Sequence, residues 1–364
     1  TSNVAVGYQA LDANTTADAN TAIGSNALGT NTTGSNNTAV GSLALTLNTS
    51  GANNVSIGRY ALGDNTTGSQ NTAVGNFALS DNTTADFNTG LGYAALLSNT
   101  TGHSNVALGA NALDANTTGN QSVALGFGAL GSNTTATANV AVGAGALGSV
   151  TTTADNVAMG RAALYHSTAA NNTGIGSLSL YLNTTGTLNS GCGRGSLQSN
   201  TTGSYNTAMG AYALLSNTTA SNNTAVGYGS LQSNTTGISN TAVGAGALDA
   251  ATTANYNTAV GMNTLTNATT GGHNTGIGND GLSSLTTAAG NTAVGSLCGD
   301  AITTGFYNTA SGFSSLRYTT TGQYNTAYGS ASLMDNTTGD QNTGLGYDAL
   351  RNNETANNNT AVGY

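Results

Sequence analysis

The stretch NTAVGNFALSDNTTADF, residues 71–87, contains one complete unit of a repeat that fills the chain. The glycine that ends its NTAVG segment, Gly75, is an anchor that recurs every 17 residues, except for one step of 16 between Gly160 and Gly176. There are 22 anchor glycines and 21 periods, which leaves no segment for a linker or a different domain. A fixed period of this kind is the sequence signature of repeat architectures such as solenoids.

The residues that lead to the anchor predict a short strand. Four residues before it stands Asn, here called the lead Asn, in 21 of 22 units, with Ser122 as the exception. Next come Thr, Val or Ser (the strand Thr position), then a small residue, then mostly Val, Ile, Leu or Met (the aliphatic position). Because side chains alternate along a strand, the strand Thr and aliphatic positions share one face. We expect that face to point into the core, and the small Asn/Ala/Gly face to receive a sibling chain.

The position four residues after the anchor is almost always leucine. Leucine occurs there in 20 of 21 units, and Gly299 is the exception. One such residue per unit predicts a single core plug in each coil. The plug leucines singled out here are Leu11, Leu28, Leu45, Leu62 and Leu79.

A unit with one strand, one Leu and turns rich in Gly and Asn cannot bury a face alone, so neighbouring units must cover it. The sequence therefore predicts an all-β fold, a parallel β-solenoid (β-roll) of about 21 coils with a 17-residue repeat. The predicted domain is a single array over residues 1–364, an excerpt of a longer fibrous protein. At about 4.8 Å between strands, the array would form a rod roughly 100 Å long. Gly, Thr and Asn are poor helix formers, which disfavours helical repeats.

The N-T-T turn that follows the plug leucine allows two interpretations. Its Asn matches the N-x-T glycosylation acceptor pattern in many units. The alternative is a ladder of buried side-chain amides that bond from coil to coil. Apolar residues such as Val150 and Leu285 replace this turn Asn elsewhere, which favours the buried ladder, whereas sugars on outward Thr or on Asn36, Asn171 and Asn222 stay possible. The predicted ladder residues are Asn14, Asn31, Asn65, Asn99, Asn116, Asn200, Asn217, Asn234 and Asn336.

Composition excludes several classes of function. The 364 residues include 52 Gly but no Pro, so the chain is not collagen. Five Arg and no Lys, with a net charge of −9, cannot form a phosphate-binding surface, so nucleic acid is not an expected partner. No apolar run approaches the length of a membrane span, so this segment is not expected to insert into a membrane.

Residues able to carry chemistry are few and do not recur. His103, His166 and His273 occupy variable positions, and Cys192 and Cys298 occupy patterned positions that predict small core residues. The glycine-rich segment at 191–195 is one copy of the repeat without a following helix, so it is not a nucleotide-binding loop. Calcium-binding β-rolls carry Asp in turns that here carry Asn and Thr. We therefore expect no catalytic residue, cofactor or metal site.

Two surface features suggest binding. Outward Thr rows can order ice, but the two Thr of the turn are adjacent and point to opposite faces, and the strand Thr position is expected to face the core. Ice binding is therefore a minor alternative. Tyr and Phe recur just after the anchor and just before the strand. They predict packing over the turns or, as the alternative, contact with a sibling chain or a glycan.

The segments Asn139–Gly143 (NVAVG), Ser122–Gly126 (SVALG) and Asn105–Gly109 (NVALG) resemble the head repeats of trimeric autotransporter adhesins. The longer N-T-A-V-G-x-x-A-L-x-x-N-T-T-G unit is similar to the shaft repeats of phage tail fibres. The adhesin resemblance implies a left-handed parallel β-roll three chains wide, although the period of 17 is longer than in that family.

The resemblance implies a non-enzymatic fibre segment outside the cell, on a cell or virion surface. Such a segment would act as a rod that spaces or presents a binding end. Its expected partners are sibling chains, with a glycan or a cell-surface receptor as a further candidate. The alternatives are an extracellular filament or matrix protein, with its Asn or Thr rows as candidate glycosylation sites, and an ice- or glycan-binding solenoid.

Overall fold

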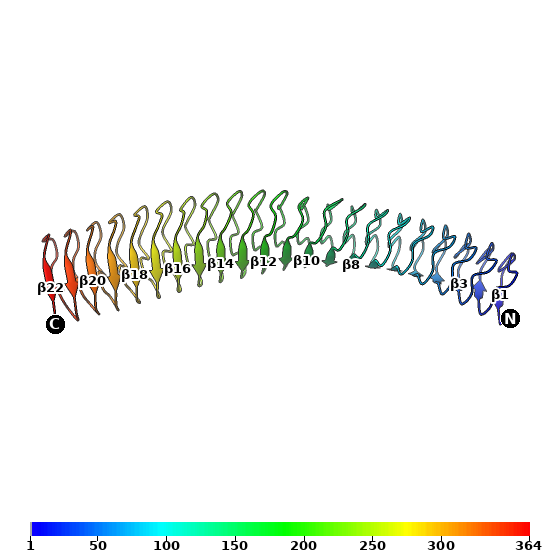
Figure 1. Cartoon of the computed structure of the whole chain (residues 1–364), viewed down its shortest axis with the longest axis horizontal. Helices are drawn as coiled ribbons and strands as arrows, with labels where there is room; N and C mark the ends of the chain where they lie inside the picture. Colours follow the sequence, from blue (N-terminus) through cyan, green and yellow to red (C-terminus); the bar gives the residue numbers. More distant parts are fainter. Residues whose placement is uncertain (1) are drawn as a thin grey trace. The chain divides into compact units, whose positions relative to one another are not determined.

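The computed structural model describes residues 2–364, and Figure 1 shows their strands and turns. These residues form two compact units. The first unit ends at Thr184, and the second spans Thr185–Tyr364. Each unit is built from three-residue strands joined by turns, and no helix occurs in residues 2–364. The predicted all-β class is confirmed.

Each unit contains eleven strands. In the first they are β1 (Val4–Val6), β2 (Thr21–Ile23), β3 (Thr38–Val40), β4 (Val55–Ile57), β5 (Thr72–Val74), β6 (Thr89–Leu91), β7 (Val106–Leu108), β8 (Val123–Leu125), β9 (Val140–Val142), β10 (Val157–Met159) and β11 (Thr173–Ile175). In the second they are β12 (Ser190–Cys192), β13 (Thr207–Met209), β14 (Thr224–Val226), β15 (Thr241–Val243), β16 (Thr258–Val260), β17 (Thr275–Ile277), β18 (Thr292–Val294), β19 (Thr309–Ser311), β20 (Thr326–Tyr328), β21 (Thr343–Leu345) and β22 (Thr360–Val362).

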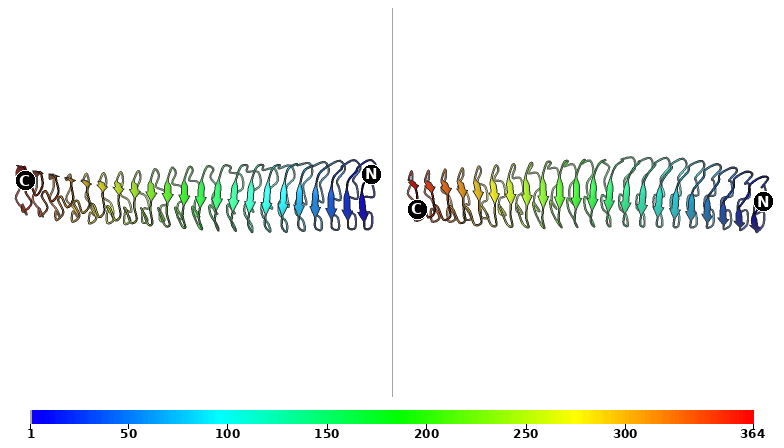
Figure 2. Two further views of the ribbon diagram at one scale, coloured as in Figure 1. Left: turned by 90° about the horizontal axis from the view of Figure 1, so that it is seen from below. Right: turned by 60° about the horizontal axis from the view of Figure 1, so that its bottom comes forward.

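Within each unit, successive strands pair in parallel and equivalent residues of the repeat face each other (Figure 2). Thr21 is opposite Thr38, for example, and Thr224 is opposite Thr241. The single 16-residue step keeps this register, because Val157 is opposite Thr173. The turns are bonded in the same way: the Leu28 N–H donates to the Ala44 carbonyl over 3.0 Å. The predicted parallel β-solenoid with a 17-residue repeat is therefore confirmed, while its left-handed coil and its extent as one array stay predictions.

The interior of each coil contains the small residues of the strand. The central residues Ala22, Ala39 and Ala73 are fully buried, whereas their neighbours at the strand Thr and aliphatic positions are partly exposed. The prediction of which strand face lies in the core is therefore wrong: the face with the strand Thr and aliphatic positions points outward. The physical reason is a narrow interior. A Cβ added to Gly90 would already lie 3.1 Å from the Ala95 carbonyl oxygen and 3.4 Å from the Leu79 side chain, so nothing much larger than Ala fits.

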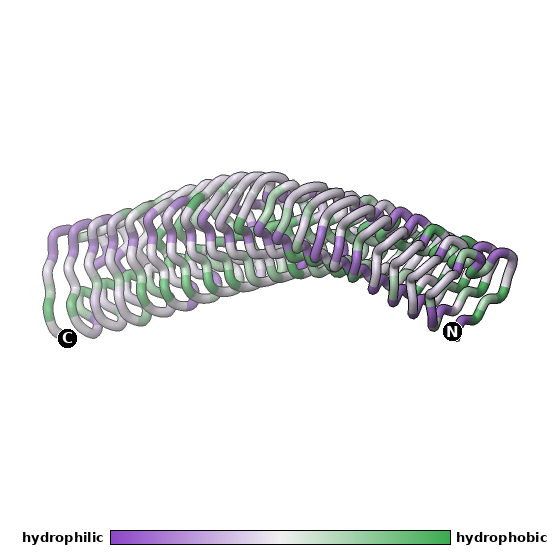
Figure 3. The backbone as a smooth tube through the Cα atoms, turned by 45° about the vertical axis from the view of Figure 1, so that its right-hand side comes forward, coloured by the Kyte–Doolittle hydropathy of each residue, from purple (hydrophilic) through white to green (hydrophobic). Residues whose placement is uncertain are grey.

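The plug leucines fill the remaining interior. Leu28, Leu45, Leu62 and Leu79 are fully buried, while Leu11, in the first coil, is half-buried. All five have positive φ, between 49° and 56°. This left-handed conformation costs about 1–2 kcal/mol for a non-glycine residue, and burial of the leucine side chain offsets it at about 1.5–3 kcal/mol. Figure 3 shows the resulting hydropathy pattern repeating from coil to coil.

In the coil that has Gly299 in place of the plug leucine, a side chain from another position of the repeat fills the space. A Cβ on Gly299 would lie 3.0 Å from Ile302 Cδ1 and 2.9 Å from Leu282 Cδ2. Ile302 occupies the turn Asn position and is buried. Its side chain therefore takes the place of the missing leucine.

The anchor glycines are required by both conformation and space. Gly75 has φ of 135°, and a Cβ there would lie 2.3 Å from the carbonyl oxygen of Gly92 in the next coil. A contact this short, in a region of φ that side chains avoid, excludes every other residue. The constancy of the anchor follows from the distance between successive coils.

Candidate interaction surfaces and buried ladders

The turn Asn side chains form a ladder inside the first unit. Asn48 Nδ2 donates to Asn31 Oδ1 over 2.7 Å and to the carbonyl oxygen of Gly51 over 2.9 Å. The same bonds recur at Asn65 and at each coil up to Asn133. Each amide thus joins two coils and also closes its own turn.

The structure places the nine predicted ladder residues in similar turns. Eight of them are fully buried, and Asn14, in the first coil, is half-buried and donates to the Ala17 carbonyl oxygen over 3.2 Å. The buried ones are Asn31, Asn65, Asn99, Asn116, Asn200, Asn217, Asn234 and Asn336. A buried, bonded amide cannot be reached for glycosylation in the folded chain. By contrast, Asn36, Asn171 and Asn222 are exposed.

The ladder stops where another residue occupies the turn position. Asn133 Oδ1 and Asn234 Oδ1 are buried and have no hydrogen-bond donor. Each precedes a coil with an apolar residue at that position, Val150 and Ala251 respectively. A buried acceptor without a donor costs about 1–3 kcal/mol. The orphaned oxygens therefore mark the ends of the amide ladder.

The lead Asn residues form a second ladder that sequence reasoning missed. Asn20 Oδ1 accepts the backbone N–H of Asn37 over 2.9 Å, and Asn20 Nδ2 donates to the Gly34 carbonyl oxygen over 2.9 Å. At Ser122 the contact persists in weaker form, since its Oγ accepts the Asn139 N–H over 3.4 Å. The signal available in the sequence was the near constancy of this Asn, which occurs in 21 of 22 repeats.

The two kinds of threonine have different surroundings. In the turns, the Thr32 hydroxyl donates to the Thr49 carbonyl oxygen over 2.9 Å, and equivalent bonds recur in both units. On the strands, Thr224 and Thr241 point outward, and no hydrogen bond within residues 2–364 engages their hydroxyls. The strand Thr row therefore presents free hydroxyl groups to the surroundings.

The strand Thr and aliphatic positions together form what we call the outward face of each unit. None of the strands carries a charged residue. The aliphatic side chains of the outward face are partly exposed to solvent: Ile23 and Ile277, for example, are each 40% exposed. In β7–β10 both outward positions are apolar, whereas from β13 to β22 the first is always Thr. An uncharged, partly apolar strip of this kind is typical of interaction surfaces.

Cys192 lies on this outward face and is exposed, so the prediction that it is a core residue is wrong. The reason is the same as above: the face of the strand that carries Cys192 points outward and not into the core. Cys298 is buried, and burial raises the pKa of its thiol. Its Sγ lies 3.1 Å from Ser315 Oγ.

Aromatic rings on the turns stack between successive coils. Tyr307 and Tyr324 have ring centroids 5.4 Å apart at an interplanar angle of 21°. Tyr165 and Tyr181 are 5.8 Å apart at 28°. The repeat places equivalent aromatic residues of successive coils next to each other, and the rotamers of these pairs bring the rings into contact.

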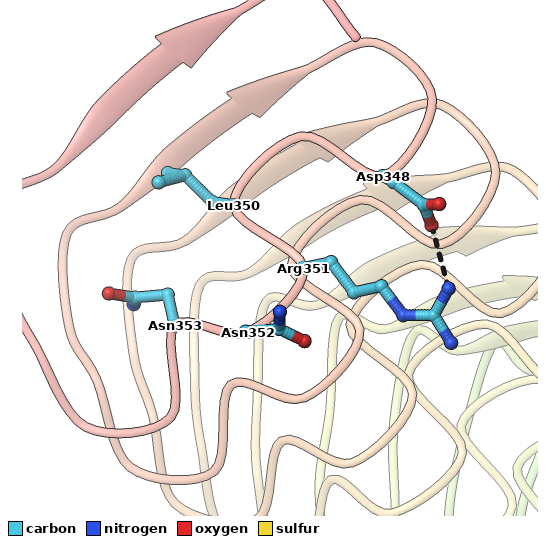
Figure 4. Close-up of a pocket in the computed structure, with 5 residues that line it drawn as sticks. All are labelled: Asp348, Leu350, Arg351, Asn352 and Asn353. Carbon is cyan, nitrogen blue, oxygen red and sulfur yellow. Dashed lines mark hydrogen bonds and ion pairs between the residues drawn. The ribbon is translucent and has the colours of Figure 1, made fainter.

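The pocket near the end of the second unit shows no catalytic constellation (Figure 4). Arg351 Nη1 lies 3.2 Å from Asp348 Oδ1 in an exposed ion pair, and Leu350, Asn352 and Asn353 complete the lining. In residues 2–364, no group of three His, Cys, Asp or Glu side chains is placed to hold a metal ion.

The three histidines do not lie together in an acid–base site. His166 packs between Tyr165 and Tyr181, with ring centroids 4.8 and 5.0 Å away. His273 stacks on Tyr256, with centroids 5.0 Å apart. His103 Nδ1 lies 3.2 Å from the Ser104 hydroxyl on an exposed turn.

No helix within residues 2–364 has the length and apolar character needed to cross a membrane. No protein-family model matches the sequence, and no curated protein is significantly similar to it.

Proposed function

We propose that the chain is a non-enzymatic structural segment of an extracellular fibre, such as a surface adhesin or a phage tail fibre. In this role it spaces or presents a binding end outside the cell or on the virion. The observation that carries the proposal is the outward face, which is uncharged and repeats partly exposed aliphatic side chains in most coils, with Cys192, Ser311 and Tyr328 as the exceptions. The resemblance of the repeat to adhesin heads and tail-fibre shafts supports the same function.

Sibling chains are the partner proposed for this face, with a trimer favoured. A second copy presents the same spacing between coils, so each aliphatic side chain meets an equivalent one over the whole length of contact. Burial of these side chains stabilises association at about 25 cal/mol per Å². The strands β7–β10 are proposed to contribute most, because Val106, Val123, Val140 and Val157 replace Thr there.

Sedimentation velocity over a range of concentrations tests self-association. The unaltered chain is expected to associate, and the double variant Leu125→Arg/Val142→Arg is expected to sediment as a monomer. The matched control is Ala144→Arg, an exposed position equivalent to those of Arg59 and Arg161. A monomeric unaltered chain at every concentration contradicts the proposal.

A glycosylated filament or matrix protein is the alternative that the exposed acceptor sites support. Asn36, Asn171 and Asn222 lie in N-x-T patterns and are exposed. Mass spectrometry of the natively expressed protein tests this alternative. Unmodified Asn and Thr throughout the chain would exclude it.

Ice binding is a third candidate function, favoured by the free hydroxyls of the strand Thr row. From β13 to β18 these Thr alternate with outward Met, Val or Ile in a regular parallel array. The Thr241→Val/Thr258→Val variant should lose thermal hysteresis if the array orders ice. Absence of hysteresis in the unaltered chain removes this candidate.

A further inference from the structure

The tyrosine pairs of the second unit lie where oxidation could link one coil to the next. Tyr307 and Tyr324 are equivalent residues of successive coils, nearly parallel, with ring centroids 5.4 Å apart. Tyr347 and Tyr364 form a similar pair, 5.5 Å apart at 24°. We propose that these pairs are sites of intramolecular dityrosine cross-linking by a peroxidase and hydrogen peroxide.

The surroundings of the Tyr307–Tyr324 pair favour the reaction. Tyr307 and Tyr324 are 56% and 50% exposed, so an external oxidant can reach both rings. The edge of Phe306 packs against both, with centroids 5.5 and 5.7 Å away, and keeps the two rings together. Exposed side chains change rotamer in picoseconds to nanoseconds, so the stacked rings can turn to bring their edges together. Attachment to neighbouring coils makes the coupling effectively unimolecular.

The proposed chemistry forms one carbon–carbon bond. Each phenol loses one electron and its hydroxyl proton to give a phenoxyl radical. The two radicals combine at the ring carbons next to the oxygen-bearing carbons, and the hydrogen on each joined carbon then moves to its oxygen and restores the phenol. The two tyrosines lose two hydrogen atoms in total, and one hydrogen peroxide is reduced to two waters.

The product would connect two coils that are otherwise joined only by noncovalent contacts and the chain itself. In a solenoid, stability depends on the interfaces between neighbouring repeats. A covalent bond across one such interface prevents local separation of the coils. This modification does not depend on the proposed fibre function, and its test does not require self-association.

The arrangement of arginines makes the cross-link measurable. The chain has no Lys, so trypsin cuts once between Tyr307 and Tyr324, at Arg317, and once between Tyr347 and Tyr364, at Arg351. After treatment of the whole chain with a haem peroxidase and hydrogen peroxide, we separate the monomer by denaturing gel and digest it. Mass spectrometry should find peptide 195–317 joined to 318–351, and 318–351 joined to 352–364, each pair two hydrogens lighter than its sum.

Two matched variants decide whether the stacked geometry matters. Tyr324→Phe should abolish the first product and leave the second at its normal yield. Tyr318→Phe should change neither, because Tyr318 lies in the same tryptic peptide and is 43% exposed, but its only ring contact described is with Arg317. Absence of joined peptides from the monomer, products found only between different chains, or loss of the first product in Tyr318→Phe would overturn the proposal.

Discussion

One stretch of the first unit and one of the second fill the turn Asn position differently. In the first, six amide-to-amide hydrogen bonds connect seven consecutive coils from Asn31 to Asn133. In the second, five consecutive coils have Ala251, Ala268, Leu285, Ile302 and Thr319 there, all buried. Both units have three-residue strands, each followed by an anchor glycine. The comparison teaches that the position is buried and filled in both stretches, and that a bonded amide and an apolar side chain can each fill it.

The anchor glycine should matter equally in both units, and this is the largest expected effect. Gly75→Ala in the first and Gly244→Ala in the second place a Cβ 2.3 Å from the next coil's carbonyl oxygen at φ of 135° and 141°. Strain and overpacking together should cost about 3–5 kcal/mol. Urea denaturation with coil-resolved hydrogen exchange measures the loss around each site.

The control for this prediction is Gly128→Ala. Gly128 has φ of 59°, with open space around the missing Cβ, and Ala94 and Ala162 occupy the equivalent position. Its effect should stay within about 1 kcal/mol. A loss as large as that of Gly75→Ala would show that the contact between coils is not the cause.

Placing an apolar residue in the amide ladder, or an amide in the apolar stretch, should destabilise the unit concerned by a smaller amount. Asn82→Leu removes the donor to Asn65 Oδ1, and Leu285→Asn adds a buried amide oxygen without a donor. Each change should cost about 2 kcal/mol, measured by urea denaturation. The control Asn36→Leu, at an exposed position that Leu188 occupies in another coil, should be nearly neutral. A neutral Asn82→Leu would show that the amide ladder contributes nothing.

Extending the ladder should give a still smaller and favourable interaction. In Val150→Asn the new amide should donate to Asn133 Oδ1, which has no donor in the unaltered chain. A double-mutant cycle with Asn133→Ala should give a coupling energy of about 1 kcal/mol. A coupling energy of zero would mean that the two amides do not meet.

The smallest effect is expected at Asp64, whose pKa is raised by burial and then by neighbouring Asp81. A raised pKa in the folded state means that the folded chain holds the proton more tightly than the unfolded chain. Stability at this site is therefore full at low pH and falls as pH rises through the raised pKa. Asp64→Asn should stabilise the first unit slightly at neutral pH, and the gain should disappear below the ordinary carboxyl pKa. A gain that is constant with pH would contradict this explanation.

Much of the fold followed from the sequence because each patterned residue has one dominant physical role. The period specified the solenoid, and the buried positions of Leu28 and Asn31 agree with their patterns. The inward face of the strand was predicted wrongly, because the alternation of side chains separates two faces without showing which one lies inside. The aliphatic residues suggested a core, yet the inward position of the strand, which lies beside the plug leucine, holds only Ala, Gly and, once, Ser56. The positive φ of Leu28 was also not predictable, since leucine rarely adopts that conformation.

The candidate interaction surface was correspondingly assigned to the wrong face. The small Asn/Ala/Gly residues expected to meet a sibling chain are buried within their own coil, as Ala39 and Asn37 show. The outward face is instead the Thr and aliphatic one. The tyrosine stacks needed the structure, because contact between rings depends on rotamers that the repeat does not specify.

The most direct test of the central claim, self-association through the outward face, uses the two native cysteines. Mild oxidation of the whole chain should give disulfide-linked dimers through exposed Cys192; these should be lost in Cys192→Ser and kept in Cys298→Ser, since Cys298 is buried. A Cys192 that reacts freely with a thiol reagent at every protein concentration, with no linked species formed, would contradict the account.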